Sequence, residues 1–160
     1  MERADFVILQ LENDENDVLL LQAASRGADY LVRSVPDGYE AIHYLRGEGR
    51  YQDRTSFPIP SLLLCDFKMP RLDGFGFLRW IRSDPEYWVT PVIMCTGSAL
   101  DADVREAYRL GANSVVTKPE GMEGLIEFLR ALYAFWSLSE CPPMLASLEA
   151  PTGQNPCLKV

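Results

Sequence analysis

Short apolar runs alternate with amphipathic stretches along most of the chain. Five runs are expected to form strands, namely 6–9 (continued by Leu11), 30–35, 62–65, 92–95 and 115–116. Runs that are apolar throughout are typical of strands buried on both faces of a parallel sheet. Between them, apolar residues at helical spacing predict helices at 17–24, 39–45, 74–83, 101–110 and 122–138. This alternation predicts an α/β fold, a doubly wound parallel sheet of five strands with five helices.

Two segments lie outside this alternation. Residues 47–60 are polar and punctuated by Gly and Pro, and they are long for a connection in a compact domain, so we expect a functional or a mobile loop. Residues 139–160 contain four prolines and predict an extended or disordered tail. We therefore expect one domain at 1–138 and a tail at 139–160 that is too short for a further module such as a helix-turn-helix.

Composition and charge exclude several classes of function. The formal net charge is −8 and no cluster of Lys or Arg is present, so nucleic acid is not an expected partner. No apolar run approaches the roughly 20 residues needed to cross a bilayer, and the N-terminus lacks the layout of a signal peptide. We expect a cytoplasmic protein without membrane contact. The cysteines form no C-x-x-C pair, which argues against a thiolate metal site.

Polar side chains follow four of the five predicted strands. Glu12-Asn13-Asp14 follow the first, Asp66 the third, Thr96 the fourth and Lys118 the fifth. Because ligands bind outside the carboxyl ends of the strands in an open α/β sheet, we expect these side chains to meet on one rim.

Phosphoryl transfer is the chemistry that fits this set of groups. Clustered carboxylates with few other ligands suit Mg²⁺, which also takes phosphate oxygens. A carboxylate such as Asp66 can act as a nucleophile and form an aspartyl phosphate. A lysine supplies a point charge for the phosphoryl group, and a hydroxyl supplies a neutral hydrogen bond. The strand ends therefore predict a phosphoryl-handling site centred on Asp66.

Four motifs carry a resemblance to a known family. They are LENDE (11–15), LLLCDFKMPRLDGF (62–75), VIMCTGS (92–98) and VVTKP (115–119). Over about residues 5–138 the sequence resembles the receiver domain of bacterial two-component response regulators. The 47–60 loop and the FWSLSE segment (135–140) are similar to stand-alone receivers grouped with bacteriophytochrome regulators. The resemblance implies a flavodoxin-like sheet in the order 2-1-3-4-5 and a signalling protein rather than an enzyme.

The resemblance also implies roles for the residues at the strand ends. Asp66 would be the phosphoacceptor, Thr96 would bond the phosphoryl oxygens, and Lys118 would pair with the carboxylate or the phosphoryl group. The implied Mg²⁺ ligands are Glu12, Asn13, Asp66 and the backbone carbonyl of Lys68. The implied phosphodonor is a sensor histidine kinase or a histidine phosphotransfer protein. Many receivers have a cis bond at the position of Lys118-Pro119, which is accessible only before proline.

Two departures from the family pattern bear on activity. The family usually has an acid where this chain has Asn13, and an amide oxygen is a neutral, weaker ligand for Mg²⁺. Asp14 is adjacent, but its side chain should point elsewhere if Asn13 faces the site. Val115 stands where the family often has a Tyr or Phe that turns inward on phosphorylation. With Val115, a signal would have to travel by shifts of loops and helices alone.

Three functions are compatible with a carboxylate at a strand end. The first is a phosphorylatable single-domain receiver, and the second is a receiver-like interaction module that no longer takes phosphate, as Asn13 and Val115 suggest. The third is a hydrolase of the haloacid-dehalogenase type, which requires an acid two residues after the nucleophile, where this chain has Lys68.

The last predicted helix carries a second apolar feature. Phe128 and Phe135 are seven residues apart and so share a face, away from the main apolar stripe. They are expected either to pack under the tail or to form a homodimer or kinase-docking surface with the fourth helix and fifth strand.

Overall fold

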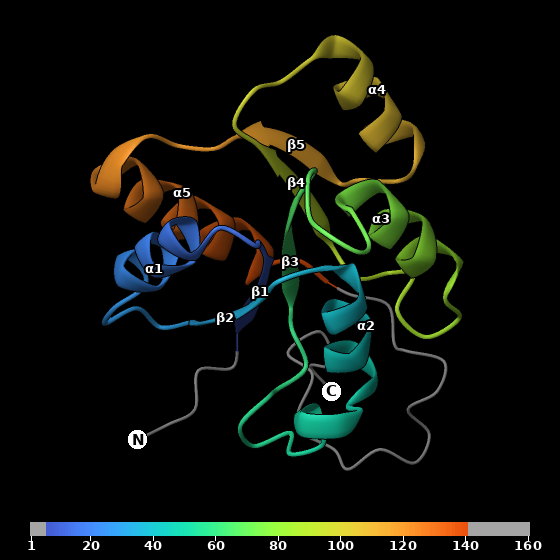
Figure 1. Ribbon diagram of the computed structural model, residues 1–160. Coiled ribbons are helices and arrows are strands. Elements are labelled where there is room, and N and C mark those ends of the chain that lie inside the picture. Colours follow the sequence, from blue (N-terminus) through green and yellow to red (C-terminus); the bar gives the residue numbers. More distant parts are fainter. Residues whose placement is uncertain (1–5, 141–160) are drawn as a thin grey trace.

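The structure is a computed structural model, and it describes residues 6–140. Five parallel strands form one sheet with helices on both faces (Figure 1). The strands are β1 (Val7–Leu11), β2 (Leu31–Val35), β3 (Leu62–Asp66), β4 (Val92–Thr96) and β5 (Ser114–Thr117). Their order in the sheet is β2-β1-β3-β4-β5, which confirms the doubly wound, flavodoxin-like arrangement that the sequence predicts.

Five α-helices alternate with the strands, as predicted. They are α1 (Glu15–Ala24), α2 (Gly38–Arg46), α3 (Gly74–Ser83), α4 (Asp101–Arg109) and α5 (Gly121–Trp136). Helices α1 and α5 cover one face of the sheet, while α2 and α3 cover the other (Figure 1). The side chains of Asp14, Asp37 and Asp73 cap the first three helices by accepting hydrogen bonds from backbone N–H groups of the first turn.

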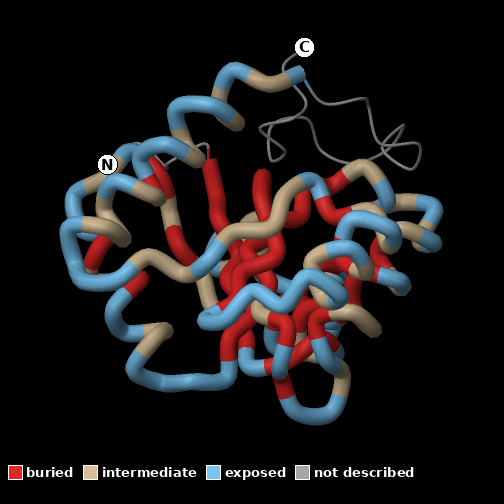
Figure 2. The backbone as a smooth tube through the Cα atoms, turned by 90° about the horizontal axis from the view of Figure 1, so that it is seen from above, coloured by how far each residue is buried: buried red, intermediate tan, exposed pale blue. Residues whose placement is uncertain are grey.

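The three central strands, β1, β3 and β4, are mostly apolar because their alternate residues enter two separate cores. One core, under α2, α3 and α4, includes Leu9, Leu11, Leu63, Cys65, Val92 and Met94. The other, under α1 and α5, includes Ile8, Leu62, Leu64, Ile93 and Cys95. The buried backbone accordingly lies at the centre of the molecule, with exposed helix surfaces around it (Figure 2).

The 47–60 segment is packed against α2 rather than extended. It contains a short 3₁₀ helix, η1 (Gly49–Tyr51), and the ring centroid of Tyr51 lies 5.1 Å from that of Tyr44 and 5.1 Å from that of Phe57. The Arg54 guanidinium donates to the carbonyl oxygens of Tyr44, at 2.7 Å, and Leu45, at the C-terminal end of α2. These contacts satisfy carbonyl groups that have no partner inside the helix.

Two expectations differ from the structure, and a third concerns residues that lie mostly outside the described range. All peptide bonds in the described part of the chain are trans, including Lys118–Pro119, so the cis bond seen in many receivers is absent here. On α5, the helical spacing of Met122, Leu125 and Ile126 predicts one apolar stripe, but Met122 is 38% exposed. The predicted tail is described only as far as residue 140, and residues 141–160 lie outside the described range. No helix within residues 6–140 is long and apolar enough to cross a membrane.

Candidate functional site

The alternation of β3 determines the direction of Asp66. Leu62 and Leu64 point into the core under α1 and α5, and Asp66 follows them with the same parity at the carboxyl end of the strand. Its side chain is 15% exposed. The chain then turns back, and the Gly74 N–H donates to the Phe67 carbonyl at 3.1 Å. The result is one carboxylate held at the rim of the sheet, on the side of α1.

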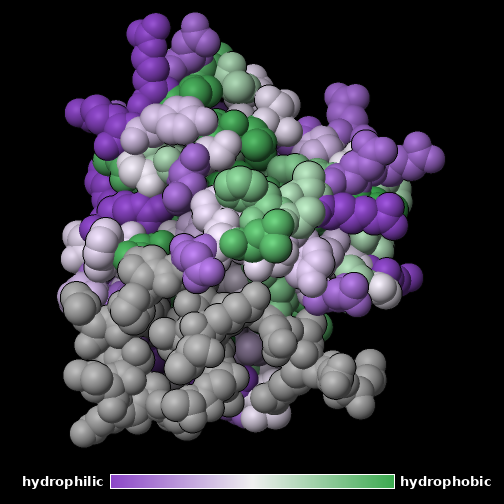
Figure 3. Space-filling view, turned by 180° about the vertical axis from the view of Figure 1, so that it is seen from behind, coloured by the Kyte–Doolittle hydropathy of each residue, from purple (hydrophilic) through white to green (hydrophobic). Residues whose placement is uncertain are grey.

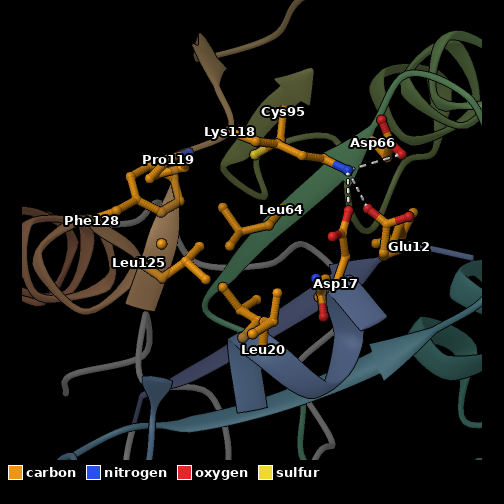
Figure 4. Close-up of a pocket in the computed structure, with 14 residues that line it drawn as sticks. Glu12, Asp17, Leu20, Leu64, Asp66, Cys95, Lys118, Pro119, Leu125 and Phe128 are labelled. Atoms are coloured by element: carbon orange, nitrogen blue, oxygen red, sulfur yellow. Dashed lines mark hydrogen bonds and ion pairs between the residues drawn. The ribbon is translucent and has the colours of Figure 1, made fainter. Parts of the chain in front are cut away.

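Lys118 lies at the centre of a cluster of carboxylates on this rim. It directly follows β5, and its backbone N–H donates to the Thr96 carbonyl at 2.8 Å, which fixes it beside the end of β4. Its Nζ lies 2.6 Å from Glu12 Oε2, 2.9 Å from Asp17 Oδ2 and 3.3 Å from Asp66 Oδ2 (Figure 4). One ammonium therefore bonds three carboxylates that come from the end of β1, from α1 and from the end of β3.

The electrostatics of the rim keep Lys118 charged. Burial opposes its charge, but the hydrogen bonds to Glu12 and Asp17 and the charge of Asp66 outweigh burial and raise the Lys118 pKa. Burial also raises the pKa of Glu12, although the hydrogen bond from Lys118 and the Asp14 backbone N–H act in the opposite direction. With all groups ionised, three carboxylates against one ammonium leave an excess of negative charge. Such a rim attracts a divalent cation.

Thr96 lies at the same rim but is engaged within its own loop. It is buried, its Oγ1 donates to the Ser98 carbonyl at 2.8 Å, and Oγ1 also accepts from the Ser98 N–H at 3.1 Å. Its hydroxyl would have to leave these partners to contact a group on Asp66.

The remaining sequence-predicted site residues, Asn13 and Lys68, are both exposed. Asn13 is exposed, and Asp14 points away to cap α1, where its Oδ1 accepts from the backbone N–H groups of Asn16 and Asp17. Lys68 is exposed in the loop after β3. Within residues 6–140, no three acidic, His or Cys side chains are arranged to hold a metal. The donors that are present nonetheless fit Mg²⁺, because carboxylate, amide and carbonyl oxygens are its usual protein ligands.

Asp17 is the member of the cluster that reasoning from strand ends missed. It lies in the first turn of α1, not at the end of a strand. The signal in the sequence is that Asp17 lies in the first turn of the helix after β1, three residues after the capping Asp14. Asp17 and Lys118 also line the polar end of a cavity of about 100 Å³ between α1 and α5, whose apolar walls include Leu20, Leu125 and Phe128 (Figure 4).

Many known proteins are similar to this chain in sequence or in fold. Residues 8–130 match the family profile described as the response regulator receiver domain. Response regulator Rcp1 of Synechocystis sp. is 30% identical over 132 residues, which cover 81% of this chain and 88% of Rcp1. The solved Mn²⁺-bound form of Rcp1 superposes with a TM-score of 0.72 at 28% identity, covering 86% of this chain and 99% of that chain.

Two further solved structures share the fold at similar identity. The phosphorylated cyanobacterial phytochrome response regulator RcpA has a TM-score of 0.75 at 31% identity and covers 86% of this chain and 99% of its own. A response regulator in red light signalling of R. palustris has a TM-score of 0.79 at 30% identity, covering 87% and 99%. The chain therefore belongs to the family of response regulator receiver domains of two-component signalling.

Proposed function

We propose that this protein accepts a phosphoryl group on Asp66 and passes the signal on through protein contacts. The observation that carries the proposal is the position of the Asp66 carboxylate, at the carboxyl end of β3 and 3.3 Å from the Lys118 ammonium. The phosphorylated form of the related RcpA supports it. The proposed donor is a sensor histidine kinase or a histidine phosphotransfer protein, and the proposed compartment is the cytoplasm, where kinases use ATP.

In the proposed reaction, an Asp66 oxygen attacks the phosphorus of a phosphohistidine. The phosphorus–nitrogen bond breaks, its electron pair stays on the imidazole, and that nitrogen later takes a proton from water. Lys118 moves with the new charge and pairs with the phosphoryl oxygens. Thr96 exchanges its contact with Ser98 for a hydrogen bond to the phosphoryl group. Each of these residues stabilises charge that develops at Asp66.

A divalent cation is the expected cofactor of this reaction. Glu12, Asp66, the Lys68 carbonyl and the Asn13 amide would hold Mg²⁺, which would neutralise the phosphoryl oxygens. Because Asn13 is exposed and neutral, we propose that Mg²⁺ binds more weakly here than in a receiver with an acid at this position.

Labelling with a small phosphodonor tests the proposed function. The wild-type chain should be labelled by acetyl phosphate in the presence of Mg²⁺, as read by phosphate-affinity electrophoresis or intact mass. Asp66→Asn should abolish the label, because an amide lacks the negatively charged oxygen that acts as the nucleophile. Asp29→Asn removes the same charge at an exposed position before β2 and should leave labelling unchanged.

Asn13 favours a second candidate, a receiver that binds a partner without being phosphorylated. Its exposed amide leaves the metal site without one acid. This candidate gains support if the wild type takes no label at millimolar Mg²⁺ and its partner binds equally well to wild type and Asp66→Ala.

We also propose a homodimer surface formed by α4, β5 and the end of α5. Phe135 and Leu138 are 65% and 82% exposed, and Tyr108 on α4 is 51% exposed. Phe128 does not belong to this surface, because it packs against the core under α1 and α5. Such a surface, free of a basic cluster, fits another protein rather than nucleic acid.

A further inference from the structure

Asp17 makes a closer contact with the Lys118 ammonium than the proposed phosphoacceptor does. Its Oδ2 lies 2.9 Å from Nζ, compared with 3.3 Å for Asp66 Oδ2. Its side chain is 40% exposed, so it stands at the mouth of the site and within reach of solvent ions. Asp17 is thus a member of the charged cluster, although it contributes nothing to either core.

The start of α1 explains why the Asp17 side chain reaches Lys118. Asp14 caps the helix, and its Oδ1 accepts from the Asp17 N–H at 3.1 Å, which fixes the rotation of the first turn. The third position of this turn then faces Lys118. Asn13, before the cap, remains exposed.

We propose that Asp17 supplies the third carboxylate of the site, replacing the charge that Asn13 does not provide, and acts as a positioning residue through Lys118. The proposal rests on the proposed receiver function. When a divalent cation binds, Asp17 keeps a partner for the ammonium, so that the carboxylates of Glu12 and Asp66 can release it and turn toward the cation.

Two physical effects of Asp17 act in the same direction on cation affinity. Its negative charge attracts the cation directly, with an energy reduced by solvent because the side chain is partly exposed. It also competes with Glu12 and Asp66 for Lys118. Without Asp17, the ammonium would pair only with these two ligands, and a cation would have to displace it from both.

Metal affinity of the full chain, measured without any phosphodonor, tests the proposal. Titration calorimetry with MnCl₂ and MgCl₂ should show roughly tenfold weaker binding for Asp17→Asn. This substitution is isosteric and removes one negative charge. Glu15→Gln is the matched control, because Glu15 is an exposed acid in the same turn of α1. It should bind within about twofold of the wild type.

A rescue variant separates a role in the site from a role in folding. Adding Asn13→Asp to Asp17→Asn should restore affinity to about the wild-type value, since it returns the missing charge beside Glu12. Urea unfolding of each variant checks that the fold is kept.

Three results would overturn the proposal: equal affinities for Asp17→Asn and Glu15→Gln, no recovery with Asn13→Asp, or no cation binding by the wild type. None of them depends on labelling of Asp66. Conversely, if Asp66 is not phosphorylated, the metal titrations still test the role of Asp17.

Discussion

At the scale of single residues, Gly74 shows how closely the start of α3 approaches Asp66, the proposed phosphoacceptor. A Cβ atom at this position would collide with the Asp66 carbonyl oxygen and lie 3.0 Å from the Met94 methyl group. No flexible side-chain end can move aside here, because the nearest atom is backbone. Glycine therefore allows α3 to begin directly against the backbone of Asp66.

We predict that Gly74→Ala destabilises the protein by about 1–3 kcal/mol, because the methyl group overpacks the turn. Urea unfolding followed by circular dichroism measures the change. Gly97→Ala is a matched control, since a Cβ there meets nothing within 4 Å, and it should change the free energy of unfolding by less than about 0.5 kcal/mol. Equal stabilities of the two variants would show that the Asp66 loop relaxes freely.

At the scale of elements, the pattern of the sequence predicted which segments are helices and strands, but not how each helix is rotated. All ten predicted elements are present, because their apolar periodicity is a local property. In α3, the helical spacing of Phe75, Leu78 and Ile81 predicts the buried face, but Phe77 rather than Phe75 is the fully buried ring. The rotation of a helix depends on its cap and on the layers packed against it. For the same reason, helical periodicity alone does not predict that Asp17 faces Lys118.

The anchoring of the 47–60 segment was equally hard to foresee. The sequence left open whether this loop is functional or mobile, because its contacts are long-range. Arg54 reaches back to carbonyls of α2, and the Tyr44 hydroxyl donates to the Pro58 carbonyl at 3.0 Å. Tyr44 is 1% exposed, so its hydroxyl is held in a neutral, buried setting.

This setting predicts a loss of stability at alkaline pH. Burial, partly opposed by the charges of Arg33 and Arg54, raises the pKa of Tyr44 to about 12, against about 10 in the unfolded chain. The contribution of the neutral hydroxyl is thus fully present below about pH 10 and is lost as pH rises toward 12.

Urea unfolding between pH 9 and pH 11.5 should therefore show a steeper loss of stability for the wild type than for Tyr44→Phe, with a difference of about 1–2 kcal/mol at the alkaline end. Tyr39→Phe is a control at a 44% exposed position and should follow the wild type. Parallel curves for all three proteins would contradict the assignment to Tyr44.

At the scale of the whole molecule, exposed apolar side chains are the feature that favours association with a second copy of the chain. A group of apolar side chains gathers near the middle of the face seen from behind (Figure 3). Among the described residues, Phe135 combines large size with 65% exposure near the end of α5. Its ring packs edge-on against Trp136, with ring centroids 5.2 Å apart, and so presents a fixed surface.

We predict that the average mass of the wild type in sedimentation experiments rises with concentration, and that Phe135→Ala shifts it toward the monomer. Burial of an aromatic ring at the centre of an interface is often worth 2 kcal/mol or more, so a shift of roughly thirtyfold in the dimer dissociation constant is expected. Leu19→Ala, at a 63% exposed site on α1, should leave self-association unchanged. A wild type that stays monomeric at high concentration would rule the dimer out.

Strand β3 connects the packed 47–60 segment to the rim of the sheet that carries Asp66. The packed 47–60 segment leads into its first residue, and Asp66 is its last. The four residue-to-residue steps of this five-residue strand separate its ends by about 13 Å. Any effect of a substitution in this segment on the proposed phosphorylation site must therefore pass along the full length of a buried strand.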